Sequence, residues 1–443
     1  MQKFVKPAVF VGISLAIFFI LRTAFPKNAG VILFLFTGLL LDLYLWNWVK
    51  KKIRTRTSFY QRFWTAVYWM PFTLLIILVA YGLVVPLMEW NQALKSYLPG
   101  FLLILYFSKM FPILGLLVAD LSGVSILLFH RLFCPIPENT VPFRRNSMVV
   151  FCGGIAGGIL FLLLLSGIFF WQFDFRVRRE IVQLKDLPPS FDGMKMVQLS
   201  DIHLGSWPSK VQLEKAVSMV NALQPDIVVF TGDLFNYGTS DGNGFETILM
   251  KLHAPEGIYA ILGNHDYGDY VSWHSPEAKR KNMEELFLYF KKLGWHLLRN
   301  ENVILKNGMD SIALIGVENW GATQRFQRLG DIRKAEKGTE GMSTRVLLSH
   351  DPTHWGSIIS RQYQDIDLTL SGHTHGGQLG IDCCGIHWSP AGWIYPEWCG
   401  LYSNPDSPSP QYLYVNQGLG NIGYSGRVGI LPEITLITLK RAK

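Results

Sequence analysis

The 443-residue sequence predicts two regions of different fold class: an all-α, multi-span transmembrane region over 1–175 and an α/β domain over 176–443. Three observations predict this division. Long apolar runs dominate the first 172 residues, and charge is distributed unequally between the two regions. In the second region, short apolar segments alternate with amphipathic helical segments.

Five apolar stretches in the first region are each long enough to cross a bilayer, which takes roughly 20 residues as a helix. A succession of five with almost no internal charge favours membrane spans over buried core helices. The sequence therefore predicts a transmembrane region of about five helices. The stretches cover residues 5–25, 30–49, 66–88, 99–128 and 147–171.

Two of these stretches allow a second interpretation. Lys3 and Lys6 precede the apolar run of the stretch 5–25 as at the start of a signal peptide, but no cleavage site is evident and another apolar stretch follows at once, so we interpret it as an uncleaved helix. The stretch 99–128 is either one long helix kinked at Pro112 or a span followed by an interfacial helix. Asp120 is then either an intramembrane functional carboxylate or a residue at the interface, and we favour the interface.

Basic residues in the short loops predict the orientation. The cluster of Lys and Arg between 50 and 62 indicates a cytoplasmic loop, whereas residues 89–98 contain only two charges, as expected outside. Five spans then place the chain beyond residue 172 outside the cytoplasm. The pair Arg144 and Arg145 is either a twin-arginine export signal or positive-inside flanking, and both send the α/β domain out. We expect a multi-pass protein of the cell (inner or plasma) membrane with an extracytoplasmic α/β domain.

Charge excludes one class of partner. Residues 1–180 contain 18 Lys and Arg against 6 Asp and Glu, whereas residues 181–443 contain 23 against 27. The second region therefore has no basic excess with which to neutralise phosphates, and we expect no nucleic acid as a partner. The five cysteines form neither a disulfide framework nor a zinc-binding pattern, although one bridge to Cys399 is open.

In the second region, five short apolar segments each run directly into polar residues. The segments 209–223 and 276–293 have apolar residues at helical spacing, so strands alternate with helices as in α/β layered domains. Ligands of such sheets bind beyond the carboxyl ends of the strands, and we expect the five polar clusters to converge there. The strands are expected at 195–200, 226–230, 257–262, 344–349 and 365–371.

The residues that follow these strands are oxygen and imidazole donors without thiolates. That mixture suits divalent Mn, Fe, Zn or Mg. Seven donors are too many for one ion and favour two ions that share a bridging carboxylate, an arrangement that activates water and stabilises a phosphoryl group. The candidate metal ligands are Asp201, His203, Asp233, Asn264, His350, His373 and His375.

Each motif alone is weak, but together they resemble the calcineurin-like metallophosphoesterase family over about residues 190–440. The motifs are DIH at 201–203, GD at 232–233, GNHD at 263–266, His350 and GHTH at 372–375. Within the family, GHTHGGQ and the tail at 416–439 resemble bacterial membrane-associated phosphodiesterases of the YkuE/YaeI type. The resemblance implies a four-layer α/β/β/α sandwich built on two sheets.

The resemblance also implies roles for individual residues. One metal would be held by Asp201, His203 and His375, and the other by Asn264, His350 and His373. Asp233 would bridge both ions, His265 would be the general acid or contact the substrate phosphate, and Asp266 would orient His265. The implied activity is hydrolysis of a phosphodiester, a pyrophosphate or a phosphomonoester.

The substrate is left open by these motifs. The segment 386–402 contains Trp388, Trp393, Tyr395 and Trp398, and is either a packed loop over the sheet or an aromatic lip at the lipid headgroup layer. A lip on a membrane-anchored enzyme favours a lipid or a lipid-linked nucleotide such as UDP-diacylglucosamine. The rival is a soluble or cell-wall phosphodiester.

Two other functional classes compete with a phosphoesterase. The protein would be a membrane sensor or transporter with a regulatory phosphoesterase-like domain, or a non-catalytic scaffold. The scarcity of charge inside the spans argues against transport. The presence of every candidate ligand argues against a scaffold.

Overall fold

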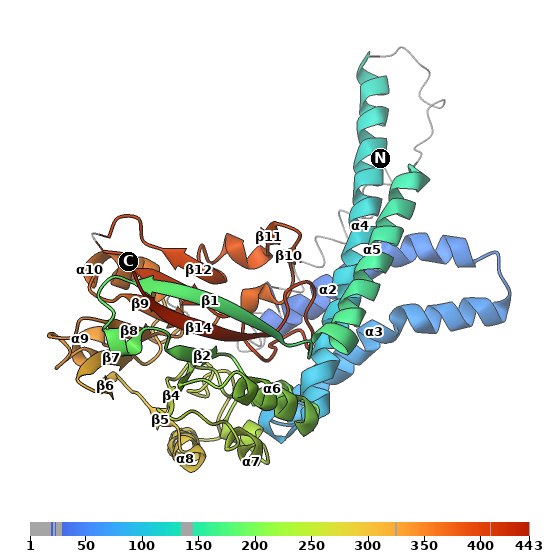
Figure 1. The fold of residues 1–443 in the computed structure, drawn as a ribbon. Coiled ribbons are helices and arrows are strands. Elements are labelled where there is room, and N and C mark those ends of the chain that lie inside the picture. Colours follow the sequence, from blue (N-terminus) through green and yellow to red (C-terminus); the bar gives the residue numbers. More distant parts are fainter. Residues whose placement is uncertain are drawn as a thin grey trace. The chain divides into compact units, whose positions relative to one another are not determined.

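The computed structural model describes residues 19, 20, 23, 29–133, 145–323, 326–407 and 409–442 (Figure 1). The chain divides into two compact units. The first, which we call the membrane unit, comprises Met1–Glu89 and Phe101–Leu163. The second, which we call the α/β unit, comprises Trp90–Gly100 and Leu164–Lys443.

Four helices in the described residues are long and apolar enough to cross a membrane. The expectation of about five is therefore corrected to four, and the stretch 5–25 lies outside the described residues apart from positions 19, 20 and 23. The expected stretch 99–128 belongs to one 42-residue helix, so a separate interfacial helix is wrong. The helices are α2 (Ala29–Ile53), α3 (Ser58–Val84), α4 (Gln92–Phe133) and α5 (Ser147–Ser166).

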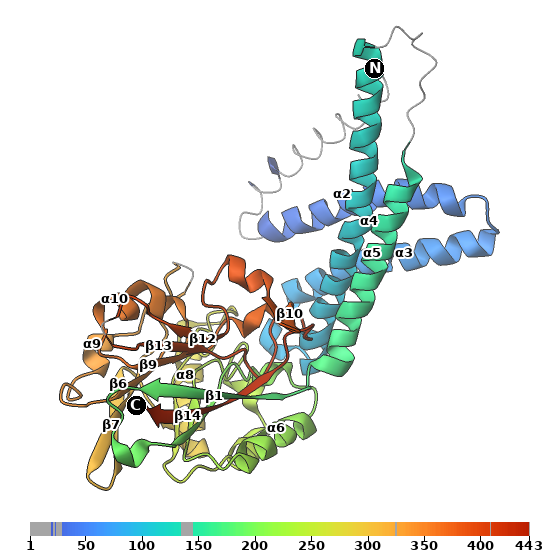
Figure 2. The same ribbon diagram turned by 45° about the horizontal axis from the view of Figure 1, so that its top comes forward.

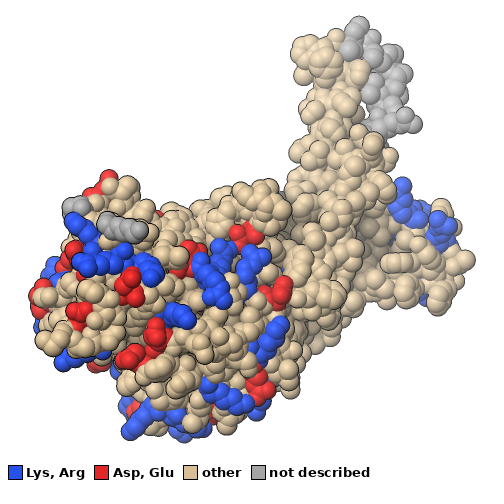
Figure 3. Space-filling view, viewed as in Figure 1, with Lys and Arg blue, Asp and Glu red and all other residues tan. Residues whose placement is uncertain are grey.

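Small residues bring α4 and α5 together inside the membrane unit. A Cβ atom added at Gly153 would lie 2.7 Å from the carbonyl oxygen of Phe111, and one at Gly157 would overlap the backbone of Ser108. Close backbone approach through glycines four residues apart is typical of helix pairs in membranes. On the face seen in Figure 3, these helices show almost no charged residues.

Asp120 is paired rather than free. Its carboxylate accepts hydrogen bonds from the guanidinium of Arg145 and, at 2.8 Å, from the hydroxyl of Tyr44. Asp120 and Arg145 therefore neutralise each other inside the membrane unit. This pairing gives Asp120 a structural role in place of the functional carboxylate that we considered.

The α/β unit contains two six-stranded mixed sheets and one short hairpin. The first sheet has the order β1-β14-β2-β3-β4-β5 and the second β12-β13-β9-β8-β7-β6, of which β12, β13 and β9 are neighbours in Figure 2. The strands are β1 (Arg176–Leu184), β2 (Lys195–Leu199), β3 (Ile227–Phe230), β4 (Ile258–Ala260), β5 (His296–Leu297), β6 (Glu301–Asn307), β7 (Asp310–Gly316), β8 (Arg345–Leu348), β9 (Leu368–Ser371), β10 (Ile381–Cys383), β11 (Ile386–Trp388), β12 (Gly400–Ser403), β13 (Tyr412–Val415) and β14 (Glu433–Arg441).

Three apolar cores produce four layers. Alternating residues of both sheets, such as Val229 and Leu370, meet in a core between the sheets. A second core joins the outer face of the first sheet to helices, and a third does the same for the second sheet. The covering helices are α6 (Lys210–Ala222), α7 (Glu246–Leu249) and α8 (Pro276–Leu293) on one side. On the other side they are α9 (Ile332–Ala335) and the π-helical turn Trp355–Ile359, which leads into α10 (Ser360–Gln362). The predicted α/β/β/α sandwich is confirmed.

Sequence patterns located most elements that position the site. All five expected strands form, and the expected helices at 209–223 and 276–293 correspond to α6 and α8. Ser209 and Ser275 cap these helices by accepting hydrogen bonds from Val211 and Ala278. β2, β3 and β4 run parallel in the first sheet, and β8 and β9 run parallel in the second, so five carboxyl ends lie at the edges of two facing sheets.

Candidate metal centre

The structure brings all seven predicted ligands to the carboxyl ends of five strands. The first sheet contributes the residues that follow β2, β3 and β4, and the second sheet those that follow β8 and β9. Two groups of three side chains have potential ligand atoms within 4.8 Å of one another. One group is Asp201, His203 and His375, and the other is Asp233, His350 and His373.

In the first group, two imidazoles point at each other. The Nε2 atoms of His203 and His375 are 3.1 Å apart, and the two rings are stacked with centroids 4.9 Å apart. The Oδ1 atom of Asp201 lies 3.2 Å from Nε2 of His375. All three side chains are buried, so their converging donor atoms are held away from water.

In the second group, His350 occupies the middle. Its Nε2 atom lies 3.3 Å from Nδ1 of His373 and 3.2 Å from Oδ1 of Asn264. Its Nδ1 atom is 2.7 Å from the carbonyl oxygen of Thr231, which directs Nε2 into the centre. A hydrogen bond on the far nitrogen of this kind is the usual support for a metal-binding histidine.

Asp233 lies between the two groups. Its Oδ2 atom is 3.2 Å from Nε2 of His350 and 3.6 Å from Nε2 of His203. Its other oxygen, Oδ1, accepts a hydrogen bond from the backbone N–H of His265 at 2.8 Å. One carboxylate oxygen therefore faces both groups while the other fixes the side chain.

The charges of this centre fit divalent cations. Burial holds the pKa of His203 well below its usual value, so this imidazole is a neutral lone-pair donor. Burial also acts to lower the pKa of His350. The negative charges of Asp233 and Asp201 outweigh this effect and raise the pKa of His350 to about 10. The carboxylates thus create a negative field that attracts positive charge, and neutral imidazole with carboxylate oxygen suits Mn, Fe, Zn or Mg.

An unusual backbone builds the centre. Five of the seven predicted ligands are non-glycine residues with positive φ, namely Asp201, His203, Asp233, His373 and His375. Such conformations cost of order 1–3 kcal/mol each and concentrate at functional sites. Two glycines permit the close packing, because a Cβ atom at Gly263 would overlap Asp233 and one at Gly372 would overlap Asp201.

His265 adjoins the first group. Its ring contacts that of His203 edge to face, with centroids 5.0 Å apart. Its Nδ1 atom is 2.7 Å from the carbonyl oxygen of Asn236. We expected Asp266 to orient His265, but the structure places the Asn236 carbonyl in that position.

Asp266 supports the backbone instead. Its buried carboxylate accepts hydrogen bonds from the N–H groups of Asp233, Leu234, Phe235 and Gly263 at 2.9–3.2 Å. Burial and the nearby Asp233 carboxylate raise the pKa of Asp266 to about 7. The side chain therefore joins the loop after β3 to the loop after β4, which carry Asp233 and Asn264.

Sequence reasoning missed several side chains around the centre. Buried Arg427 donates hydrogen bonds to the carbonyl oxygens of Gly418 and Gly420, and its Nη2 atom lies 3.5 Å from Nδ1 of His375. Arg427 lies in the tail at 416–439, which is the signal that would have found it. Tyr270 contacts Asn264 and His265, but follows GNHD outside any motif.

The tryptophan-rich segment divides into buried and exposed parts. Trp398 is buried, and the Tyr395 hydroxyl lies 3.0 Å from Nε2 of His373. Large apolar side chains are exposed on the β10–β11 hairpin and the turn after it, with Trp393 79% and Ile394 70% exposed. We call this surface the apolar rim; it consists of Ile381, Ile386, Trp388, Trp393 and Ile394. Of the four aromatic residues that we considered for a packed loop or a lip, Trp398 is packed and Trp388 and Trp393 are exposed.

The cysteines are not bridged in the described residues. Cys383 and Cys384 are exposed, and the buried thiol of Cys399 lies 3.2 Å from Nε2 of His387. Burial raises the pKa of Cys399 to about 12. The bridge to Cys399 that the sequence left open does not form.

A four-layer sandwich with two Asp/His groups at the carboxyl edges of its sheets defines the class of metallophosphoesterases. Residues 194–377 match the family model of calcineurin-like phosphoesterases, and residues 24–170 match the model described as a probable calcineurin-like phosphoesterase, transmembrane domain. The chain belongs to the calcineurin-like metallophosphoesterase family, and it is a multi-pass membrane protein with four candidate spans.

Curated relatives agree with this assignment. The chain is 33% identical over 270 residues to a transmembrane protein with metallophosphoesterase domain from Danio rerio, with 59% of this chain and 56% of that protein covered. It is 31% identical over 264 residues to the uncharacterized metallophosphoesterase YkuE of Bacillus subtilis, with 57% and 82% covered. It is 29% identical over 280 residues to the UDP-2,3-diacylglucosamine pyrophosphatase LpxG of Chlamydia trachomatis, with 53% and 81% covered.

Proposed function

We propose that this protein is a membrane-anchored phosphoesterase that uses two divalent metal ions. The observation that carries the proposal is the position of Asp233, whose Oδ2 atom faces His350 and His203 in two separate donor groups. The proposed first site is Asp201, His203 and His375, and the second is Asn264, His350 and His373, with Asp233 shared. Two bound cations would lower the pKa of a water between them and stabilise charge on the phosphoryl oxygens.

His265 is the proposed general acid. Since Nδ1–H donates to the Asn236 carbonyl, Nε2 is the nitrogen left to face the leaving oxygen, and it gives a proton there from the doubly protonated imidazolium. Asp266 holds the two loops that carry Asp233 and Asn264, so its role is positioning. Arg427 adds fixed positive charge behind His375.

A lipid-containing phosphoester is the proposed substrate. The apolar rim begins within two residues of Tyr395, whose hydroxyl contacts His373 of the centre. Such a surface on a chain with four membrane spans fits acyl chains that enter from the bilayer. LpxG, a relative of this chain, is a pyrophosphatase for the lipid-linked nucleotide UDP-2,3-diacylglucosamine. A soluble or cell-wall phosphodiester is the alternative.

The proposed location of the active site is extracytoplasmic. Residues Trp90–Gly100 belong to the α/β unit, in which Lys95 Nζ lies 2.7 Å from Asp241 and Ser96 donates a 2.7 Å hydrogen bond to the Gly205 carbonyl. The α/β unit and the connection between α3 and α4 therefore share one side of the membrane. The basic residues at 50–62 precede α3, on the other side, and basic loops stay in the cytoplasm.

The activity test uses the full-length protein in detergent. We expect about two metal ions per chain and hydrolysis of a phosphodiester. His265→Ala should keep the metal and lose most turnover, which separates an acid from a ligand. A protein that binds metal but hydrolyses no mono-, di- or pyrophosphate ester would instead support the scaffold or sensor alternatives.

The substrate test compares detergent-dispersed UDP-diacylglucosamine with soluble bis(p-nitrophenyl) phosphate. The double variant Trp393→Ser/Ile394→Ser should lower kcat/KM for the lipid about tenfold, because apolar contact area is lost, and leave the soluble ester unchanged. Met309→Ser removes a fully exposed apolar side chain from the turn between β6 and β7 and serves as the control. Equal losses on both substrates would favour the soluble alternative.

Sidedness has a natural probe in the exposed cysteines 383 and 384. A membrane-impermeant maleimide should label them in intact cells or spheroplasts. The Cys383→Ser/Cys384→Ser variant should lose this label. Labelling that appears only after lysis would place the active site in the cytoplasm.

A further inference from the structure

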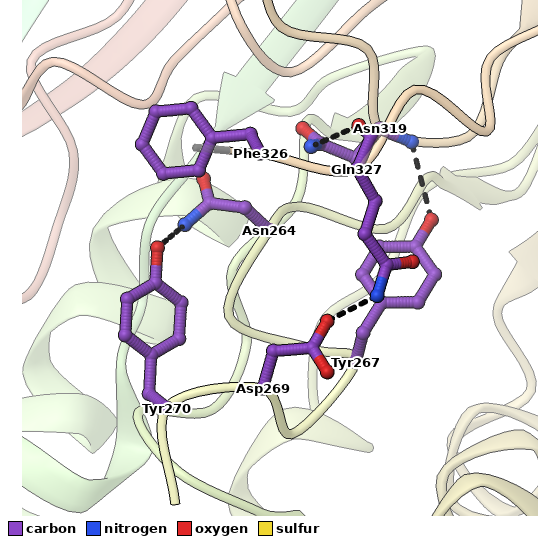
Figure 4. Close-up of a pocket in the computed structure, with 7 residues that line it drawn as sticks. All are labelled: Asn264, Tyr267, Asp269, Tyr270, Asn319, Phe326 and Gln327. Atoms are coloured by element: carbon purple, nitrogen blue, oxygen red, sulfur yellow. Dashed lines mark hydrogen bonds between the residues drawn. The ribbon is translucent and has the colours of Figure 1, made fainter. Parts of the chain in front are cut away.

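A cavity of about 230 Å³ lies beside the proposed second metal site. Two loops form it: one follows β4 and carries Asn264, and the other follows β7. Figure 4 shows the lining side chains, which are Asn264, Tyr267, Asp269, Tyr270, Asn319, Phe326 and Gln327. Because Asn264 belongs to both the cavity wall and the metal centre, a group in the cavity would lie next to a phosphoryl group at the metals.

Tyr270, which lines the cavity, contacts Asn264 and His265 at the metal centre. Its hydroxyl accepts a 2.7 Å hydrogen bond from Nδ2 of Asn264, which turns the amide oxygen toward His350. Its ring stacks on that of His265 with centroids 3.8 Å apart and an angle of 4° between planes. Tyr270 is therefore a positioning residue for a proposed ligand and for the proposed acid.

Phe326 lies on the side of Asn264 opposite Tyr270 (Figure 4). Its ring meets that of His373 edge to face at 5.0 Å. The cavity is thus bounded by two aromatic rings, each packed on a histidine of the centre. Aromatic walls of this kind favour ring-shaped ligands over extended chains.

The far end of the cavity is polar, and its one charged lining residue among those described, Asp269, is paired with Lys279. The side-chain amide of Gln327 donates a hydrogen bond to Asp269, and the backbone N–H of Asn319 donates one to the Tyr267 hydroxyl at 3.1 Å. Oδ1 of Asn319 is buried and has no hydrogen-bond partner among the described residues. A buried acceptor without a partner costs free energy, which a ligand that donates a hydrogen bond would recover. Because Asp269 is paired with Lys279, the charges at this end are balanced, which favours a neutral ligand over a second phosphate or a cation.

We infer that this cavity is the subsite for a neutral, hydrogen-bond-donating ring esterified to the scissile phosphate, such as a nucleobase-bearing group or a sugar. The inference rests on the proposed function and extends it. The centre then has two unlike neighbours, the polar aromatic cavity beside Asn264 and the apolar rim beyond Tyr395. A phosphoester that joins a ring-bearing headgroup to acyl chains matches both.

Binding tests the subsite without requiring turnover. Uridine and N-acetylglucosamine are titrated separately into the full-length, metal-loaded protein, and binding is followed by ligand-observed NMR. We expect one of them to bind, and Asn319→Leu to weaken it about tenfold through the lost acceptor. Uridine binding identifies a nucleobase source, and N-acetylglucosamine binding identifies a sugar source. Binding of neither overturns the inference.

Kinetics provide the second measurement, with UDP-glucose as the ring-bearing ester and glycerophosphoethanolamine as the ring-free one. Asn319→Leu should raise KM about tenfold for the first and leave the second unchanged. Gln212→Leu, an amide-to-leucine change on α6 at another acceptor without a partner, is the matched control. Equal effects of both variants, or equal effects on both esters, overturn the subsite. Failure of the wild type to hydrolyse either ester counts against the proposed function, while the titrations still decide the subsite.

Discussion

Two buried aspartates illustrate opposite uses of charge in this molecule. In the membrane unit, the Asp42 carboxylate forms an ion pair with Lys109 at 2.7 Å and accepts a 3.0 Å hydrogen bond from the Tyr106 hydroxyl. The Tyr68 hydroxyl donates a hydrogen bond to the backbone carbonyl oxygen of Asp42. Lys109 also lies 4.7 Å from the centre of the Tyr68 ring. In the α/β unit, Oδ2 of Asp233 faces only histidine nitrogens.

The difference separates a structural cluster from a site. Asp42 joins α2 to α3 and α4, and its charge is compensated by protein donors, so it holds helices together. Asp233 and Asp201 face histidine nitrogens, so their charge is compensated by protons or metal cations that occupy the centre. Asp42 and Asp233 are both buried carboxylates. The side chains that face each carboxylate determine whether it has a structural role or belongs to a functional site.

Asp233→Asn should have the largest effect on turnover. Loss of the shared charge should leave at most one metal ion per chain and reduce hydrolysis to the detection limit. Metal analysis by mass spectrometry with a phosphodiester assay measures this. Asp42→Asn, the matched change in the membrane unit, should keep both ions. A variant of Asp233 that retains two ions would refute the bridging role.

Tyr270→Phe tests how strongly the centre depends on its support. Without the hydroxyl, the Asn264 amide is free to turn, so metal affinity and kcat should fall about 10- to 100-fold, as at other supporting positions. Titration of the metal-free protein measures the affinity. Tyr289→Phe removes a buried hydroxyl that bonds to Gly242 and is the control. Unchanged metal affinity for Tyr270→Phe would remove the positioning role.

Lys95→Met removes the ion pair between Lys95 and Asp241 in the α/β unit, which resembles the pair between Lys109 and Asp42 in the membrane unit. Lys95 pairs with one oxygen of Asp241 at 2.7 Å, and the other oxygen receives the N–H of Tyr237, next to the carbonyl that holds His265. We expect kcat to fall about tenfold with little change in KM, because the acid is displaced.

Lys251→Met, which breaks an exposed pair with Glu214, should leave kcat unchanged. The double variant Lys95→Met/Asp241→Asn should recover part of the stability, since no charge is then left unpaired. Equal kinetics for the Lys95 and Lys251 variants would show that the Lys95 pair does not reach the active site.

Lys109→Met should have the smallest effect on turnover and a large effect on stability. Breaking the pair leaves Asp42 buried without its cation, which costs about 3–5 kcal/mol. Thermal unfolding in detergent should shift down, while kcat per folded molecule stays constant. Lys52→Met at the exposed end of α2 is the control. A loss of kcat in the folded Lys109 variant would contradict the separation of the two clusters.

Local patterns predicted much of this molecule. The five strands, α6, α8 and the seven donors were all readable because each donor follows an apolar run that can only be a buried strand. The described residues contain four helices long and apolar enough to cross a membrane where about five were expected, and the remaining stretch, 5–25, lies mostly outside those residues. The interaction of Asp266 was also wrong, because adjacency to His265 in sequence does not determine which way a carboxylate points.

The sequence by itself determined the layers, the donor types and the presence of a membrane region, because apolar periodicity and the chemistry of side chains are local properties. Only the tertiary structure decided which donors lie close together and that Asp233 lies between two donor groups. It also decided that Asp42 forms an ion pair with Lys109 of another helix. It placed Asn319 and Phe326 beside Asn264 and left two tryptophans and three isoleucines exposed on the apolar rim. These outcomes depend on contacts between residues distant in the chain, which no local pattern encodes.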